Sequence, residues 1–231
     1  MIRKSRQRID RVDKRAAEES YEQAKQLAAS SPVPTPTPSL DLNRVPPLEM
    51  DTVFVPTPEP IEPLDPAMEY LLTLDLDSLR RVNGEVEGWI VVPDTVLDYP
   101  LMQSANNYTY LSFSWDLQRS NRGAIFFDSQ MKTDFSYFNT IIYGHNMQGG
   151  SMFNTIRKME DQSFFEQHPI VYIVTDDLVR RFEVFSGFEA DVTGPAYWLG
   201  ELKEEHKQAL LDYSLAENTL KTDLVRMWRT P

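Results

Sequence analysis

The chain has 231 residues, of which 41% are hydrophobic, and this allows one sizeable core with an appendage. Its formal net charge of −12 argues against a nucleic-acid partner, because binding to phosphate is driven mostly by Lys and Arg. It contains neither a cysteine nor a run of ~18 to 20 apolar residues. The lack of cysteine excludes disulfides, thiolate metal sites and thiol catalysis for these residues. The lack of a long apolar run means that no transmembrane or signal segment is visible in the sequence.

Residues 1–30 form a basic segment with a net charge of +3, which leaves −15 for the rest of the chain. From Arg11 to Ala29 the composition is rich in Ala, Glu, Gln and Lys, which predicts a helix that ends before Pro32. A solvated helix is the simplest interpretation. The basic beginning equally suits a position beside an anionic membrane surface, and composition does not choose between the two.

Residues 31–66 hold eleven of the sixteen prolines, in text such as "SPVPTPTPSL" and "PTPEPIEPLDP". Because Pro lacks the N–H donor, this stretch predicts an extended linker and neither helix nor sheet. Pro-rich chain is semi-rigid and acts as a spacer. An SH3-type ligand is the alternative, but the acidic neighbours and the alternating Thr favour a stalk.

Residues 67–231 contain the patterns of a folded domain. In "PAMEYLLTLDLDSLRRVN" the apolar spacing predicts a helix with one buried stripe: Met68, Leu71, Leu72, Leu76 and Leu79. "GWIVVPDTVLDYPLMQ" predicts two strands joined by a turn at Pro93-Asp94, and short strands follow in "GAIFFD", "NTIIYGH", "IVYIVT" and "RRFEVFSGFEAD". Their close spacing leaves no room for βαβ crossovers, so we expect a mainly β, mostly antiparallel sheet or barrel with a few helices. "LGELKEEHKQALLDYSLAEN" predicts a late helix.

Polar residues at strand ends are the candidates for chemistry. His145 follows the short run 141–143 and Gly144. At this position we expect a strand to end and the side chain to face a groove. A His there can exchange protons near neutral pH. A structural or surface His is the alternative. His168 and His206 have no partner at ligand spacing, so no metal site is predicted.

Three aspartates also lie at predicted turns or strand ends, namely Asp94, Asp98 and Asp128. Asp is common at such positions because its side chain bonds to nearby backbone, so we interpret them as structural.

Taken in order, "NGEVEGWIVVPDTVLDYPLMQSANNYTYL", "GAIFFD" and "NTIIYGHNMQGGSMFNTIRKMEDQSFFEQHPIVYI" resemble class B sortases, the cysteine transpeptidases of Gram-positive cell surfaces. The resemblance runs from about Leu72 to Asp223. It implies a sortase-type β-barrel with N-terminal helices and a helix before the final strands, at the extracellular face of the cell membrane. It implies no cofactor.

In this family a Cys thiolate attacks the amide after a Thr in a sorting signal, a His exchanges the proton, and an Arg stabilises the charge on the intermediate. An amine of peptidoglycan or of a pilin then releases the acyl enzyme. By motif the resemblance implies that His145 is the catalytic His, and that Asn107, Leu111 and Tyr143 line or adjoin the substrate groove. Ordinary packing of a barrel wall is the alternative for these last three residues.

The sequence departs from the family after the late helix. A "TLSTC"-like strand that ends in the Cys, and the Arg of the next strand, have no counterpart in "DLVRMWRTP". Arg226 and Arg229 match no Arg motif, and Ser214 lies in the predicted helix and is a weaker nucleophile than a thiolate. The N-terminal membrane anchor of the family is also not visible. We therefore expect a domain truncated before the catalytic Cys, with its final strands missing.

Three functional hypotheses follow from the sequence. The first is a class B sortase polypeptide with incomplete catalytic machinery, inactive as given. The second is a non-catalytic cell-surface protein that binds sorting-signal peptides. The third is a stalk protein in which the linker and the basic helix matter most, although a spacer does not require a sortase-like domain.

Overall fold

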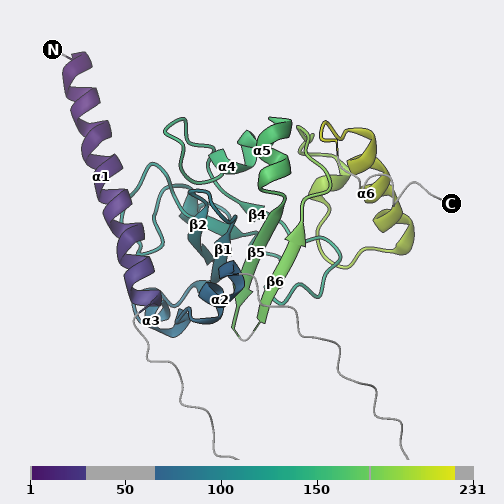
Figure 1. Ribbon diagram of the computed structural model, residues 1–231, viewed down its shortest axis with the longest axis horizontal. Helices are drawn as coiled ribbons and strands as arrows, with labels where there is room; N and C mark the ends of the chain where they lie inside the picture. Colours follow the sequence, from purple (N-terminus) through teal and green to yellow (C-terminus); the bar gives the residue numbers. More distant parts are fainter. Residues whose placement is uncertain (1, 30–65, 177, 222–231) are drawn as a thin grey trace, which may run out of the picture.

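The computed structural model describes residues 2–29, 66–176 and 178–221. The predicted linker, apart from Pro66, and the terminal "DLVRMWRTP" lie outside these ranges. The helices in Figure 1 are α1 (Ile2–Ala28), α2 (Pro66–Leu72), α3 (Leu76–Arg80), α4 (Asn154–Lys158), α5 (Gln162–Gln167) and α6 (Glu204–Ala216). Two 3-10 turns are added, η2 (Thr109–Leu111) and η3 (Pro195–Tyr197). The predicted late helix is therefore confirmed as α6.

A six-stranded curled sheet forms the centre of the domain. Its strands are β1 (Val86–Val91), β2 (Asp98–Met102), β3 (Ile125–Phe127), β4 (Ile142–Tyr143), β5 (Ile170–Thr175) and β6 (Leu178–Glu183). They lie in the order β4-β3-β2-β1-β5-β6. All pairs are antiparallel except β2 with β3. The mainly β, mostly antiparallel class is confirmed, and every predicted strand segment contributes to this sheet, though only "RRFE" of the last one lies within β6.

The turn between β1 and β2 forms where the sequence places Pro93-Asp94. Asp94 adopts φ 59°, a left-handed conformation that Asp tolerates better than most residues. β1 carries a bulge between Val86 and Gly88, which increases local twist. A Cβ atom at Gly88 would lie 2.1 Å from the Val174 carbonyl oxygen of β5, so only glycine allows the two strands this approach.

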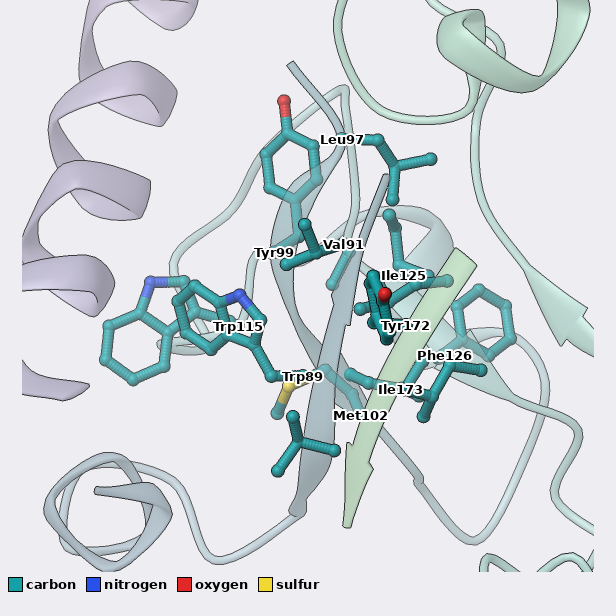
Figure 2. Close-up of a cluster of buried hydrophobic side chains, with 14 of the residues drawn as sticks. Trp89, Val91, Leu97, Tyr99, Met102, Trp115, Ile125, Phe126, Tyr172 and Ile173 are labelled. Carbon is teal, nitrogen blue, oxygen red and sulfur yellow. The ribbon is translucent and has the colours of Figure 1, made fainter. Parts of the chain in front are cut away.

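The core lies between the curled sheet and the segments that cover it (Figure 2). Its largest fully buried side chains are aromatic, including Trp89, Trp115, Tyr110, Tyr172 and Phe126. Burial of one large apolar side chain contributes about 1.5–3 kcal/mol, so this cluster supplies much of the driving force for folding.

The helix predicted after the linker is interrupted. α2 ends at Leu72 and α3 begins at Leu76, where the Asp75 side chain accepts a hydrogen bond from the Ser78 N–H at 3.1 Å. Such an N-cap starts a new helix because it satisfies a backbone donor of the first turn. The predicted stripe is buried at Leu71, Leu76 and Leu79, but Leu72 is 61% exposed, so its assignment to the stripe is wrong.

The second half of α1 packs against the domain, and the interpretation as a solvated helix is wrong there. Ala17, Tyr21, Ala24 and Ala28 are buried. The Tyr21 hydroxyl donates to the Gly123 carbonyl at 2.7 Å. Small residues at this spacing let α1 approach the rest of the domain closely. A search of the sequence for large apolar residues does not detect a contact of this kind. None of the described helices is both long and apolar enough to cross a bilayer.

Candidate functional site

His145 lies just beyond β4, at one edge of the described sheet. Tyr143, the last residue of β4, pairs with Phe126 of β3. The chain then forms a loop that is closed by an antiparallel bridge between Asn146 and Met152. The His145 carbonyl accepts a hydrogen bond from the Phe153 N–H at 3.0 Å. The backbone on both sides of His145 is therefore fixed, while its side chain stays partly exposed.

The imidazole of His145 is oriented by a second segment. Its Nε2 lies 2.9 Å from the carbonyl oxygen of Leu111, the last residue of η2. A carbonyl oxygen can only accept, so Nε2 must donate the hydrogen of this bond. In a neutral imidazole the other nitrogen, Nδ1, then carries the lone pair. His145 is thus held in the tautomer in which Nδ1 can accept a proton.

Two glycines allow this arrangement. Gly123 has φ +60°, and a Cβ atom there would lie 2.0 Å from the Tyr110 carbonyl oxygen and 3.2 Å from Cδ2 of His145. A Cβ at Gly144 would lie 2.8 Å from the Phe153 ring. Because real Cβ atoms do not approach so closely, any side chain at Gly123 would displace the segment that leads to Leu111, the imidazole, or both.

Asp128 connects the polar residues on the Tyr143 side of the site. It follows β3 directly and is 2% exposed. Its carboxylate accepts hydrogen bonds from Asn107 Nδ2 at 2.8 Å, the Tyr143 hydroxyl at 2.9 Å and the Gln130 N–H at 2.9 Å. The Ser129 N–H donates to Asn107 Oδ1 at 2.7 Å, which fixes the other end of that amide. A buried carboxylate satisfied in this way rigidifies its surroundings.

Tyr143 is kept in its neutral form. Burial raises the pKa of Tyr143 well above its usual value, and the hydrogen bond and negative charge of Asp128 raise it further. The hydroxyl therefore remains a donor to Asp128 at physiological pH.

The four predicted site residues fall into two linked pairs. Asn107 and Tyr143 meet at Asp128, and Leu111 and His145 meet through the Leu111 carbonyl. Tyr143 and His145 are two residues apart at the end of the same strand, so both pairs belong to one site. The Leu111 side chain is 41% exposed beside it.

Asp128 is structural as predicted, since its carboxylate accepts from the nearby Gln130 N–H, but its contacts with Asn107 and Tyr143 were not predicted. The available signal was an Asp directly after the apolar run "AIFF": a carboxylate buried at the end of such a strand requires hydrogen-bond partners. Asp98 is structural as predicted: it accepts from Trp89 Nε1 at 2.7 Å and pairs with Lys25.

The other candidates do not join this site. His168 Nδ1 lies 3.2 Å from the Pro93 carbonyl oxygen, and His206 packs edge-to-face against Trp198. Within the described ranges no group of three or more His, Asp or Glu side chains is arranged to hold a metal ion. Arg226 and Arg229 lie outside the described residues.

A cavity of about 750 Å³ lies next to the site. Asn146, the residue after His145, forms part of its wall, together with apolar residues of α4 and of the segments that follow β6 and α6. These apolar residues include Phe153, Ile156, Phe188 and Leu220. This cavity therefore lies beside the loop that carries His145, because Asn146 is both the next residue and part of the cavity wall.

Comparisons with known proteins agree with this architecture. Sortase B of Listeria monocytogenes is 36% identical over 115 residues, which cover 50% of this chain and 47% of that relative. The solved structure of sortase B from Listeria monocytogenes superposes with a TM-score of 0.57 and 30% identity, over 62% of this chain and 82% of that structure. The chain belongs to the class B sortase family. A Staphylococcus aureus sortase B-substrate complex matches with a TM-score of 0.60 and 27% identity, over 64% of this chain and 68% of that structure.

The chain matches only part of the length of these class B sortase relatives. The chain spans about half the length of the Listeria relative and 61% of the Staphylococcus aureus sortase B. No protein-family model matches the chain.

Proposed function

We propose that this chain provides the His-bearing wall of a class B sortase transpeptidase site, with His145 as the catalytic His. The observation that supports this most directly is the hydrogen bond from His145 Nε2 to the Leu111 carbonyl, which leaves Nδ1 as a base. A base held in a fixed orientation at a strand end is what nucleophile activation requires.

In the proposed reaction, His145 Nδ1 takes the proton of a cysteine thiol. The thiolate sulfur attacks the carbonyl carbon of a Thr residue in a sorting signal, and a tetrahedral oxyanion forms. When the C–N bond breaks, the imidazolium returns the proton to the leaving amine, and a thioester remains. The amine of an acceptor then attacks the thioester carbonyl carbon and gives up a proton to the neutral imidazole of His145, the C–S bond breaks, and the thiolate leaves as the amide forms.

The substrates proposed for this chain follow from its relatives. Solved structures of sortase B contain a substrate in one case and triglycine in another. We propose that the corresponding ligands here are a sorting-signal peptide and an amine of peptidoglycan or of a pilin, at the outer face of a Gram-positive membrane. Asn107, Leu111 and Tyr143 are the proposed substrate-groove residues.

The nucleophile is not among these 231 residues, because the sequence has no cysteine. We therefore propose that the chain by itself does not cleave peptides. A second proposal is that it binds sorting-signal peptides without cleaving them. The network of Asn107, Asp128 and Tyr143 favours this, because it forms one fixed groove wall without the nucleophile.

A chimera separates these proposals. The Cys- and Arg-bearing strands of a class B sortase are joined after Lys221, and cleavage is measured with a fluorogenic peptide library that fixes one Thr and varies its neighbours. We expect cleavage by the chimera, none by the original chain, and a loss of roughly 100-fold or more in His145→Ala. His206→Ala, on exposed α6, is the matched control and should cleave normally. Equal cleavage by the His145→Ala chimera would refute the catalytic role.

Binding is measured on the original chain with the same peptides in uncleaved form. Saturable binding that is lost in Tyr143→Ala and kept in His206→Ala supports the peptide-binding proposal. If the original chain does not bind the peptides even at millimolar concentration, the peptide-binding proposal is excluded. The catalytic proposal, tested with the chimera, then stands alone.

A further inference from the structure

A closed cycle of hydrogen bonds joins the start of β1 to η2. The Glu85 N–H donates to Asn83 Oδ1 at 3.0 Å, Asn83 Nδ2 donates to the Tyr110 hydroxyl at 2.8 Å, and that hydroxyl donates to Glu85 Oε2 at 2.6 Å. Asn83 and Tyr110 are buried, and Glu85 is half-buried. In a cycle of this kind each bond polarises the next, so the three side chains hold one another in a single arrangement.

Tyr110, the middle residue of η2, is fixed at both of its ends. Burial raises the pKa of the Tyr110 hydroxyl well above its usual value, and the hydrogen bond to Glu85 raises it further, so the hydroxyl stays a donor. At the other end, the Tyr110 carbonyl accepts from the Ala124 N–H at 2.9 Å. Between them, the ring packs against Phe126 of β3 with its centroid 6.1 Å away. Tyr110 therefore attaches η2 to β1 and to β3 at once.

The attachment of η2 sets the direction of the Leu111 carbonyl. The Leu111 N–H donates to the Tyr108 carbonyl at 3.2 Å, and the Ser112 N–H donates to the Thr109 carbonyl at 3.2 Å. The Leu111 carbonyl and the Ser112 N–H belong to the same peptide group, which is planar. Fixing that N–H therefore fixes the carbonyl to which His145 Nε2 donates at 2.9 Å.

We propose that Glu85 and Tyr110 are positioning residues for His145. Through η2 they hold the Leu111 carbonyl where it keeps the His145 proton on Nε2. A Phe would fill the same space in the core as Tyr110 does, so the hydroxyl and its partners serve orientation and not volume. A buried hydroxyl costs free energy unless it is hydrogen-bonded, which makes its place in the cycle specific. The bearing of this pair on catalysis rests on the proposed function, whereas its effect on the His145 proton does not.

The test uses NMR on the full ¹⁵N-labelled chain at about pH 8, where imidazoles are ordinarily neutral. Two quantities are measured for His145: the rate at which the Nε2–H proton exchanges with water, and the separation of the Nδ1 and Nε2 chemical shifts. In Tyr110→Phe we expect exchange to be roughly 10-fold faster and the two shifts to approach each other, because the bond to the Leu111 carbonyl weakens.

Two substitutions at Glu85 separate its role as an acceptor from its charge. Glu85→Gln keeps an oxygen that can accept from the Tyr110 hydroxyl, and it should leave the His145 signals as they are in the original chain. Glu85→Leu removes the acceptor and should act as Tyr110→Phe does. Because Glu85 is half-buried, both variants are expected to fold. An effect of Glu85→Gln as large as that of Glu85→Leu would overturn the positioning role.

Tyr172→Phe is the matched control. Tyr172 is 1% exposed in the same core, but it lies on β5, which β1 and β2 separate from β3. Its substitution should lower stability and leave the His145 proton unaffected. The proposal is overturned if Tyr110→Phe and Glu85→Leu leave the exchange rate unchanged, or if Tyr172→Phe raises it equally, since the effect would then be a general loosening. These measurements need no nucleophile, so their outcome is independent of whether the chimera cleaves.

Discussion

The centre of the curled sheet and its β6 end differ in how much of their surface is buried. Every residue of β3 is buried, as are nearly all of β1 and β2, whereas no residue of β6 is. In α6 only Leu210 and Ser214 are buried. The firmly packed part of the domain is thus the part that carries α1 and the segments leading to His145, and the part around β6 and α6 covers less core.

This difference has a consequence for the site. Leu111 and Asp128 belong to segments attached to the buried strands, and they orient His145 and Tyr143. A base must be held within a fraction of an ångström of its working position, which packed elements do better than loosely covered ones. We therefore expect substitutions near β1 to β4 to cost stability, and those on β6 and α6 to cost little.

The largest effect is expected at Trp89, which is fully buried and donates to Asp98. Trp89→Ala should lower the free energy of unfolding by about 3–5 kcal/mol, since it removes a large side chain and leaves a cavity. Leu178→Ala on β6, where Leu178 is 56% exposed, should change it by less than about 0.5 kcal/mol. Urea unfolding measures the free energy of unfolding of both variants. Similar losses in the two would contradict the difference in packing between β1 and β6.

Gly123→Ala is expected to cost about 3 kcal/mol, from a left-handed backbone conformation together with the contacts at Tyr110 and His145. It should also shift the NMR signals of the His145 ring. Gly149→Ala is the matched control, because nothing lies within 4 Å of a Cβ there. Thermal unfolding and NMR spectra are measured for both variants. Equal stabilities would contradict the claim that this position requires glycine.

Asp128→Ala should cost about 2 kcal/mol, because the Asn107 amide, the Tyr143 hydroxyl and the Gln130 N–H lose their acceptor. Asp212→Ala removes an acceptor from Gln208 on the exposed face of α6 and should cost less than about 0.5 kcal/mol. Urea unfolding compares the two, and an equal cost would show that the buried network adds nothing.

The smallest effect tests the packing of α1. Tyr21→Phe keeps the ring but removes the hydrogen bond to the Gly123 carbonyl, and about 1 kcal/mol should be lost. Arg15→Ala, on the exposed side of the same helix, should lose only about 0.3–0.5 kcal/mol from its pair with Glu19. If Tyr21→Phe unfolds at the same urea concentration as the original chain, the hydrogen bond to Gly123 contributes nothing to the stability of the domain.

The sequence predicted the elements whose signals are local. The turn at Pro93-Asp94 has its own chemistry, and β-branched residues mark the neighbouring strands, so β1 and β2 were found. The position of His145 beyond a short strand was found for the same reason.

Contacts between distant residues were not predictable in this way. Tyr21 bonds to a carbonyl 102 residues away, and Ala17, Ala24 and Ala28 look like ordinary helix formers until a partner surface is known. Asp128 joins Asn107 to Tyr143 only after three separate segments have folded together. The break between α2 and α3 does have a local signal, the Asp75 cap, but the apolar spacing runs through it and concealed it.

The most direct test is the tautomer of His145, observed by ¹⁵N NMR on the original chain at about pH 8, where imidazoles are ordinarily neutral. The three His residues are assigned with His145→Gln, His168→Gln and His206→Gln variants. We predict that His145 carries its proton on Nε2, hydrogen-bonded to the Leu111 carbonyl, with Nδ1 unprotonated. A proton on Nδ1, or rapid exchange between the two nitrogens, would contradict the claim that this fold holds His145 ready as a base.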